Sequence, residues 1–364
     1  MIVYVSPAEM NGGILQFSTS ITRETRKLRE CKLFLPNVVD SKLFEDISED
    51  VVTYKKVKTL KKNDKGIYDV AKQIMSFSPS TVIFLEDSIL MQQINEILYK
   101  AGINTAVVIH DIQHHPYRNM SARKIAVDLI RRIMTRRTIK MCTRIILLSK
   151  NSEEAFRNEY KSDNSVVFRL PAHVPNAQPE APTELGDDIN QFFLFFGRID
   201  EYKGINRLCS AYSALPEEVK RASKLVIAGK GNLSDEEQGL IKADSNIHLI
   251  SRFIEDSEMV WLFQNSKAVI MPYIEASQSG VLPIAYKFGK PVIVSNLQGL
   301  TENLSIDKTG CVFDTVDELK EILCQFDKDN FSEQEILDFY QTNYSWESNL
   351  ENLLGVFQTE VSDS

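Results

Sequence analysis

Two positively charged residues lie in one loop in the second half of the chain. Arg198 and Lys203 follow an aromatic strand candidate at 192–196, and a helix candidate begins directly after them. Two fixed cations beside a helix start suit a diphosphate, because Arg binds phosphate oxygens bidentately and a helix N-terminus attracts anions. The alternative is that both cations pair with Asp200 and Glu201 at the surface, and this loop alone favours neither interpretation.

A second loop of this kind follows the strand candidate at 268–271. Glu275 lies in the loop, and Pro283 occupies the first turn of the next helix candidate, where proline lacks only an N–H that would have no partner anyway. Glu275 could accept sugar hydroxyls or stabilise positive charge; the alternative is a carboxylate that caps a helix. N–H groups at the helix start can receive an anion, and they lie around Gln278, Ser279 and Gly280.

Several common cofactor and nucleophile motifs are absent. Gly12-Gly13 and Gly229-Lys230-Gly231 each follow a strand candidate, but neither has the GxGxxG spacing of a dinucleotide site. A nicotinamide-dependent dehydrogenase is therefore disfavoured. The sequence also lacks GxSxG and a P-loop, which disfavours the acyl-transfer and phosphoryl-transfer enzymes that use them.

A histidine and an aspartate end a buried strand candidate in the first half of the chain. His110 and Asp111 are joined by His114 and His115, but without the helical spacing of a zinc site, so we expect no metal here. We expect His110 to donate to a substrate oxygen. The alternative is a histidine satisfied by Asp111 or by a backbone carbonyl. Glu86 ends a neighbouring strand candidate and could line the same site.

Residues 118–144 contain nine basic residues and one acidic residue, although the whole chain has a net charge of −8. The helix candidate at 122–141 places an apolar stripe of Ile125, Leu129 and Ile133 beside basic residues spaced by four. One interpretation is an amphipathic helix on an anionic membrane; the other is a solvated helix with an ordinary core face. The basic residues at this spacing are Arg132, Arg136, Lys140 and Arg144.

Length and composition limit the class of protein. The chain has 364 residues, enough for about two domains, and is 43% hydrophobic and 25% charged, as in ordinary globular proteins. Its five cysteines include no CxxC pair, which favours a reducing cytosol. The negative net charge disfavours nucleic acid as a partner. The N-terminus does not resemble a secretion signal, so we expect a cytoplasmic protein.

Strand and helix candidates alternate along the chain, which predicts parallel α/β sheets. A stretch with four prolines, residues 170–182, separates two such series and is expected to be a linker. We predict two doubly wound α/β domains at 1–178 and 179–343, facing each other across a cleft, with a final helix at 344–364 packing back on the first. The strand candidates are 2–5, 32–35, 81–85, 106–110, 144–148, 166–170, 192–196, 224–228, 247–250, 268–271, 291–294 and 311–313.

The order of these loops resembles the retaining GT-B glycosyltransferases of glycosyltransferase family four, which build bacterial capsule, O-antigen and exopolysaccharide. The similarity extends over essentially the whole chain and is strongest at 192–315. It rests on Gly12-Gly13, His110-Asp111, Gly197-Arg198, Lys203-Gly204, Gly229-Lys230-Gly231, Glu275, Gly289-Lys290-Pro291-Val292, Gly299-Leu300-Thr301-Glu302 and Tyr344-Ser345-Trp346-Glu347.

The resemblance implies metal-independent transfer, with retention, from a nucleotide-diphosphate sugar, most simply a UDP-sugar, to a glycan or lipid-linked glycan. It implies no cofactor. The implied catalytic residues are Glu275, His110, Arg198 and Lys203. The implied donor and diphosphate residues are Gly12, Gly13, Gly197, Arg198, Lys203, Gln278, Ser279, Gly280 and Val281. The implied nucleotide-side residues are Gly229, Lys230, Arg252 and Phe253, and the acceptor-side residues are Asp111 and Glu86.

One position departs from the family pattern. The family has a second Glu eight residues after the first, where it holds the ribose, but here that position is Pro283, or Ile284 when aligned from Gly289. Neither side chain can accept a hydrogen bond. The alternatives to a glycosyltransferase are another GT-B enzyme, such as a nucleotide-sugar epimerase or a phosphorylase, and a non-catalytic sugar-binding protein.

Overall fold

The computed structural model divides the chain into two compact units. The first comprises Met1–Arg169 with Trp346–Ser364, and the second comprises Leu170–Ser345. The structure describes residues 1–9, 13–57, 64–110, 112, 122–186, 189, 191–276 and 278–357, with the side chains of 122–131 left out. The domain boundaries expected from the sequence were 178/179 and 343/344. The units in the structure instead meet at 169/170 and 345/346, so the linker prolines lie at the start of the second unit.

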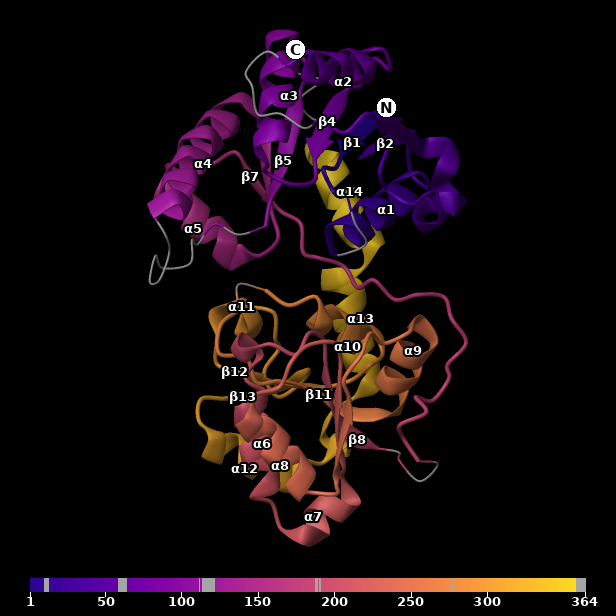
Figure 1. The fold of residues 1–364 in the computed structure, drawn as a ribbon, viewed down its shortest axis with the longest axis vertical. Coiled ribbons are helices and arrows are strands. Elements are labelled where there is room, and N and C mark those ends of the chain that lie inside the picture. The colour runs from indigo at the N-terminus through magenta and orange to yellow at the C-terminus, as the bar shows by residue number, and fades with distance from the viewer. Residues whose placement is uncertain are drawn as a thin grey trace. The chain divides into compact units, whose positions relative to one another are not determined.

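The first unit contains a parallel sheet of seven strands in the order β3-β2-β1-β4-β5-β6-β7 (Figure 1). Strand β1 is buried along its whole length, since helices cover both faces of such a sheet. The strands are β1 (Ile2–Val5), β2 (Cys31–Pro36), β3 (Val51–Tyr54), β4 (Thr81–Phe84), β5 (Thr105–Ile109), β6 (Arg144–Leu147) and β7 (Ser165–Val167).

The helices of the first unit alternate with its strands. Ser88 and Ser149 cap the N-termini of two of them, as serine side chains commonly do, by accepting a backbone N–H three residues on. The helices are α1 (Gly13–Thr25), α2 (Lys65–Met75), α3 (Ile89–Lys100), α4 (Ala122–Met141), α5 (Lys150–Tyr160) and the 3₁₀ segment η1 (Ser41–Asp50).

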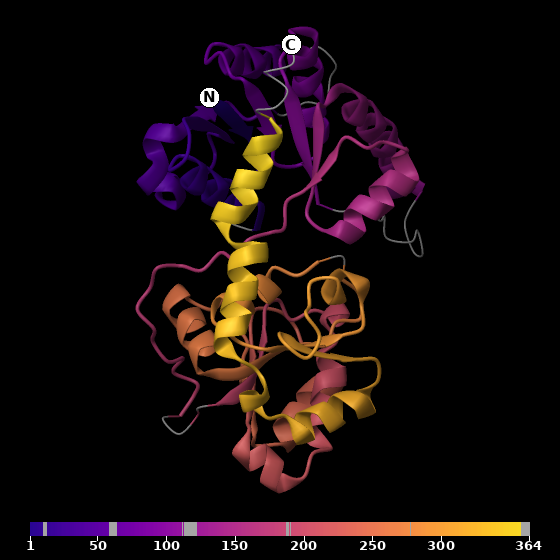
Figure 2. The same cartoon turned by 180° about the vertical axis from the view of Figure 1, so that it is seen from behind.

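The last described helix, α14 (Trp346–Val356), belongs to the first unit although it ends the chain. The ring of Trp346 stacks on Phe17 of α1, with ring centroids 6.2 Å apart. The Asn349 side chain accepts the backbone N–H of Arg169 at 3.0 Å. Figure 2 shows α14 in yellow against the first unit, where the final helix was expected to pack.

The second unit contains a parallel sheet of six strands in the order β10-β9-β8-β11-β12-β13. Its residues form one large buried cluster that includes the aromatic run of β8. The strands are β8 (Phe192–Phe196), β9 (Leu225–Ala228), β10 (Ile247–Ile250), β11 (Ser266–Met271), β12 (Val292–Ser295) and β13 (Gly310–Phe313).

Longer helices of the second unit begin with polar caps, such as the capping box between Ser234 and Glu237. The α-helices are α6 (Ile205–Ser213), α7 (Glu217–Ala222), α8 (Asp235–Ala243), α9 (Asp256–Asn265), α10 (Val281–Lys287), α11 (Gln298–Thr301), α12 (Val316–Gln325) and α13 (Glu333–Tyr344). The 3₁₀ segments are η2 (Glu201–Lys203) and η3 (Lys328–Asn330).

The predicted fold class is confirmed: both units are α/β with a parallel sheet. In each sheet the strand order changes direction beside the first strand, between β1 and β4 and between β8 and β11. Ligands of such sheets bind outside the carboxyl ends of the strands at this switch point. The sequence analysis missed β3, because this edge strand follows an acidic segment and is only partly buried. It also missed the short helices α7 and α11.

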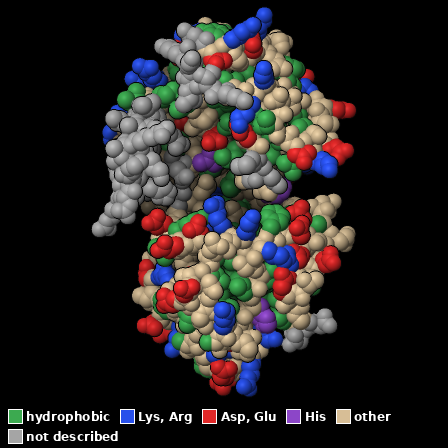
Figure 3. All heavy atoms as spheres, in the orientation of Figure 1, with side chains coloured by type: hydrophobic (Ala, Val, Ile, Leu, Met, Phe, Trp, Pro, Cys, Tyr) green, Lys and Arg blue, Asp and Glu red, His purple; other side chains and the backbone are tan. Residues whose placement is uncertain are grey.

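Charges of both signs are interspersed over the visible face of the second unit (Figure 3). Of the helices that the structure describes, none combines the length and the apolar character needed to cross a membrane.

Candidate functional site

The backbone segments that follow β8 and β9 pack against each other and form the floor of the candidate site. Gly229 has a φ of +154°, and a Cβ added to it would lie 1.8 Å from the carbonyl oxygen of Gly197. The N–H of Gly197 donates to the carbonyl of Ala228 at 3.0 Å. Gly229 is therefore required by the close approach of two chain segments, and Gly197 by its φ of +125°, a conformation that favours glycine.

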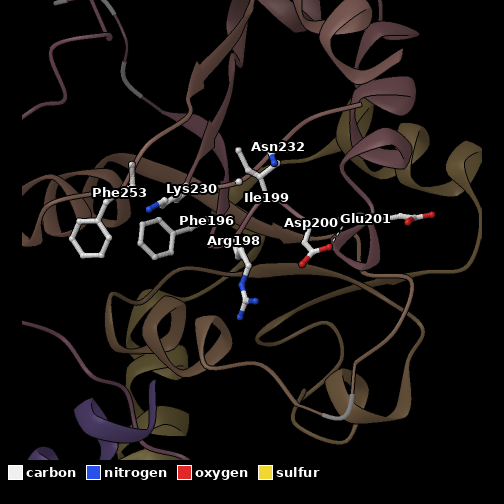
Figure 4. Close-up of a pocket in the computed structure, with 12 residues that line it drawn as sticks. Phe196, Arg198, Ile199, Asp200, Glu201, Lys230, Asn232 and Phe253 are labelled. Carbon is white, nitrogen blue, oxygen red and sulfur yellow. Dashed lines mark hydrogen bonds between the residues drawn. The ribbon is translucent and has the colours of Figure 1, made fainter. Parts of the chain in front are cut away.

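A pocket of about 790 Å³ opens above this floor (Figure 4). Pockets of about 300–1,000 Å³ are typical of small-molecule sites. Figure 4 shows the rings of Phe196 and Phe253 at one end, near Lys230, with Asp200 and Glu201 on the far side of Arg198. The lining residues are Phe196, Gly197, Arg198, Ile199, Asp200, Glu201, Gly229, Lys230, Gly231, Asn232, Phe253 and Ile254.

Phe253 is an apolar side chain that no packing requirement explains. It is 59% exposed although it is large and hydrophobic, and it lines the pocket with Phe196 and Lys230. Aromatic faces of this kind stack on flat heterocycles, and each such contact contributes about 1–3 kcal/mol. The predicted nucleotide-side residues Gly229, Lys230 and Phe253 therefore share one pocket.

Arg252, the fourth residue predicted on the nucleotide side, has other partners. Its guanidinium group donates to Glu184 at 2.7 Å and to Glu258 at 2.6 Å. The hydrogen bonds from Arg252 lower the pKa of Glu184 to about 2. Arg252 is not one of the lining residues of the pocket, so in this structure it joins residue 184 to α9.

Arg198 and Lys203 do not pair with the acidic residues of their own loop. In the described part of the chain, neither has an ion pair with Asp200 or Glu201. The Asp200 carboxylate instead accepts the backbone N–H of Glu201 at 2.9 Å, drawn as a dashed line in Figure 4. The described residues therefore do not show the ion pairs of the surface-pairing alternative, although the charge of Asp200 still acts on Lys203.

Lys203 lies on aromatic rings. Its Nζ atom is 3.5 Å from the ring centroid of Tyr273 and 5.1 Å from that of Tyr202. Burial, with a smaller contribution from the positive charge of Arg198, lowers the pKa of Lys203 to about 8, although the negative charge of Asp200 acts in the opposite direction. A dianionic ligand would relieve both effects, because it would neutralise Arg198 and give the ammonium group a partner.

The two loops contact each other through their backbones. The N–H of Ile274 donates to the carbonyl of Tyr202 at 2.8 Å. Gly204 has a φ of +66°, and a Cβ there would lie 2.0 Å from the carbonyl oxygen of Pro272. Only glycine fits this approach, so Gly204 holds the cationic loop against the loop after β11.

The start of α10 lies beside the end of β8. A Cβ added to Gly197 would lie 3.7 Å from Cγ2 of Val281, the first residue of α10. The Ser279 hydroxyl accepts the N–H of Val281 at 3.3 Å. Gly280 is the N-cap residue, without a side-chain cap hydrogen bond. Glu275 is exposed and lies on the same loop as Ser279.

In the first unit, His110 is bonded to backbone. Its Nε2 is 2.9 Å from the carbonyl oxygen of Leu85, so this nitrogen holds the proton and donates it. This is the backbone-carbonyl alternative considered for His110, and the Nε2 proton is therefore not available for the expected donation to a substrate oxygen. Glu86 follows Leu85 and is half-buried.

Other predictions for the first unit are tested only in part. Gly13 begins α1, and a Cβ added to it would meet no atom within 4 Å. Gly12, Asp111 and the pair His114-His115 lie outside the described residues. Among the residues that were searched, no three or more His, Cys, Asp or Glu side chains form a group that could hold a metal ion.

Helix α4 has the bounds predicted for the basic amphipathic helix. Ile133 of its apolar stripe is 52% exposed; Arg136 and Lys140 are exposed, and Arg132 is half-buried. Ile125 and Leu129 lie among residues whose side chains are not described. Arg144 belongs to β6 rather than to α4, and it donates to the carbonyl of Thr143 at 3.0 Å.

Tyr273 is the site residue that the sequence analysis missed. It is 1% exposed and lies between β11 and Glu275, under Lys203. An aromatic residue directly after a buried strand usually belongs to the core, so its type gave no sign of a role. Its position two residues before the predicted Glu275 is the signal that could have found it.

The sequence of this chain is similar to that of known glycosyltransferases. Residues 180–341 match the family model described as "Glycosyl transferases group 1". The "Uncharacterized glycosyltransferase MJ1607" of Methanocaldococcus jannaschii is 29% identical over 125 residues. That match covers 34% of this chain and 32% of the relative, so it spans about a third of the relative's length.

Two solved structures are similar over nearly the whole chain. Alr3699/HepE of Anabaena, in complex with UDP, has a TM-score of 0.73 at 14% identity, covering 98% of this chain and 99% of that one. A glycosyltransferase from Rickettsia africae ESF-5 has a TM-score of 0.73 at 17% identity, covering 100% and 99%. The chain therefore has the GT-B fold, and its residues 180–341 are similar to the glycosyl transferases group 1 family.

Proposed function

We propose that the protein is a retaining, metal-independent glycosyltransferase that moves a sugar from a nucleotide-diphosphate sugar to a glycan or lipid-linked glycan in cell-surface polysaccharide biosynthesis. One observation supports this most: Arg198 lines a pocket of about 790 Å³, and neither Arg198 nor Lys203 of the same loop forms an ion pair with Asp200 or Glu201. Alr3699/HepE, which shares the fold, has been solved with UDP, with UDP and glucose, and with UDP-glucose. A UDP-sugar is therefore the first donor to test.

We assign the base, the diphosphate and the sugar of such a donor to successive groups of residues. The base stacks on Phe253 and Phe196, and the diphosphate approaches Arg198 and Lys203. When the bond to the sugar breaks, negative charge develops on the diphosphate, and preorganised cations stabilise this charge without reorganisation. Glu275 would hold the sugar. The side chains supply two positive charges, which is the reason to expect transfer without a divalent metal.

What holds the ribose differs from the family pattern. Pro283, at the position of the family's second Glu, is buried in the first turn of α10, and Ile284 after it is half-buried. Neither side chain has an oxygen that could accept a ribose hydroxyl. We therefore expect weaker discrimination between ribose and 2′-deoxyribose than a carboxylate would give, because a missing hydroxyl leaves no buried acceptor unpaired.

A thermal-shift screen tests the donor class. We expect UDP to raise the unfolding temperature, with GDP and dTDP as the compared nucleotides, because ligand at 100 times its Kd adds about 2.7 kcal/mol of stability. UDP-sugars that bind are then incubated with and without candidate acceptors. Release of free sugar without an acceptor would instead indicate an epimerase. Binding of free sugar with no response to any nucleotide would indicate a sugar-binding protein.

Location is part of the same proposal. We propose a cytoplasmic protein that attaches to the inner face of the cell membrane through α4. The exposed Ile133 beside the exposed Arg136 and Lys140 supports this, because an exposed apolar residue among cations suits an anionic lipid surface. A lipid-linked acceptor would be presented at that surface.

A further inference from the structure

We propose that Tyr273 is a positioning residue of the diphosphate site, whose ring face holds the Lys203 ammonium group and whose hydroxyl group holds Ser279. One side chain then fixes the cationic loop after β8 and the loop that precedes α10. The inference rests on the proposed function for its consequence, but the contacts are present in the ligand-free chain.

The ring of Tyr273 is a built platform rather than an occasional neighbour. The residue is 1% exposed, so its ring cannot move away. Lys203 Nζ lies 3.5 Å above the ring centroid, well within the roughly 6 Å over which the negative face of an aromatic ring attracts a cation. The half-buried ammonium group thus has a partner other than water.

The hydroxyl group of Tyr273 forms a hydrogen bond with Ser279, in the loop that precedes α10. Its Oη atom is 3.3 Å from Ser279 Oγ. Ser279 Oγ is also 3.5 Å from Met271 Sδ, which only accepts, and it accepts the N–H of Val281; donation from Ser279 to the sulfur leaves Tyr273 as the donor to Ser279. Burial raises the pKa of Tyr273 far above its ordinary value, so the phenol keeps the proton that it donates.

The backbone around Tyr273 keeps both contacts in register. The neighbouring residue Ile274 donates to the carbonyl of Tyr202 at 2.8 Å, and Gly204 permits the close approach of the carbonyl of Pro272. These contacts flank Tyr273 in the chain and Lys203 in its loop. The position of Lys203 is therefore defined from both sides before any ligand arrives.

This arrangement has a consequence for diphosphate binding. A free lysine must lose side-chain entropy when it binds an anion, whereas Lys203 has already lost part of it on the ring. Without the ring, the ammonium group would move into solvent, and its position and its pKa would both change. Tyr273 thus acts on the ligand through Lys203 and not by touching it.

A double-mutant cycle measured by calorimetric titration of UDP tests the inference. We expect Tyr273→Leu to weaken UDP binding by about two- to thirty-fold, the range given by a cation–π contact. We expect no further loss when Tyr273→Leu is added to Lys203→Met, because the ring would act only through Lys203. Additive losses, or unchanged UDP affinity in Tyr273→Leu, would overturn the inference.

Two variants separate positioning from a loss of packing. Tyr273→Phe keeps the ring, so we expect it to retain most of the affinity and to lose at most about tenfold with the hydrogen bond to Ser279. Tyr286→Leu removes another buried tyrosine of the same unit, at the other end of α10, where it is bonded to Thr309. We expect this control to bind UDP as wild type does.

An NMR titration of lysine side chains separates this inference from the proposed function, because it needs no nucleotide. We expect the Lys203 signal to titrate near pH 8 in wild type and in Tyr273→Phe, and to move away from pH 8 in Tyr273→Leu. An unchanged titration in Tyr273→Leu would overturn the inference even if UDP binds. Failure of wild type to bind UDP, with the expected titration, would count against the proposed function alone.

Discussion

Lys203 is a site residue whose charge changes within the range of ordinary assay buffers. Burial and the charge of Arg198 lower its pKa to about 8, below the usual value for lysine. As the pH rises through 8, the free protein loses this proton, and the diphosphate loses one of its two cations. We therefore predict that UDP affinity falls above about pH 8 and is steadier below it.

Calorimetric titration of UDP between pH 6.5 and 9.5 measures this dependence. Lys203→Met is the reference, because any change that it still shows with pH belongs to the nucleotide or to other groups. A fall in affinity with pH that is the same in wild type and in Lys203→Met would mean that Lys203 does not bind the diphosphate.

The two cations should each contribute to binding and to transfer. Arg198→Ala and Lys203→Ala remove charged hydrogen bonds of roughly 1.5–3 kcal/mol each, so we predict about ten- to 150-fold losses in nucleotide affinity and in transfer. Lys308→Ala, on an exposed turn of the same unit, is the matched control and should change neither. Unchanged UDP affinity in both site variants would remove the diphosphate assignment.

At the scale of the elements, the glycines at the ends of β8 and β9 hold the floor of the pocket. Gly229→Ala would place a Cβ 1.8 Å from the carbonyl oxygen of Gly197 at a φ of +154°. We predict a clear loss of stability, of about 1–3 kcal/mol or more.

Gly239→Ala gives the opposite expectation in the same unit. Gly239 lies exposed in α8, where an added Cβ meets no atom within 4 Å, so alanine should stabilise by up to about 1 kcal/mol. Urea unfolding of both variants measures the contrast. Equal stability of the two variants would show that the β8–β9 floor tolerates a side chain.

Helix α4 is the element proposed to meet the membrane. Charge reversal at Arg132, Arg136 and Lys140 should abolish co-sedimentation with anionic vesicles, since each basic residue near such a surface contributes about 1 kcal/mol. Neutral vesicles should bind neither form, and added salt should release wild type. Equal recovery of wild type and variant in the supernatant would leave a solvated helix face.

Much of the element order could be predicted from the sequence, because buried parallel strands such as Phe192–Phe196 are continuous apolar runs. The edge strand β3 was missed because its burial is mixed. The loops that supply Arg198 and Glu275 could be predicted, since each follows such a strand. The role of Tyr273 could not, because it depends on two loops that meet only in the fold, and neither could the ion pairs of Arg252, whose partner Glu184 is 68 residues away.

At the scale of the whole molecule, the account predicts transfer without a divalent metal. The charge that develops on the leaving diphosphate is met by Arg198 and Lys203, so we expect activity to persist after treatment with EDTA. Transfer assays with and without EDTA, Mg²⁺ and Mn²⁺ measure this. Complete loss in EDTA, restored by either metal, would overturn the metal-independent mechanism and direct attention to Asp111 and the pair His114-His115.

The central claim is that this chain recognises the diphosphate of a nucleotide sugar, and calorimetric titration of UDP, UMP and uridine into one protein preparation tests it most directly. We predict saturable binding of one UDP per chain, at least about tenfold tighter than UMP, because the second phosphate gains the charged hydrogen bonds of Arg198 and Lys203. This advantage of UDP over UMP should disappear in the variant that carries both Arg198→Ala and Lys203→Ala. Equal affinity for UDP and UMP in wild type, or no binding of UDP, would contradict the account.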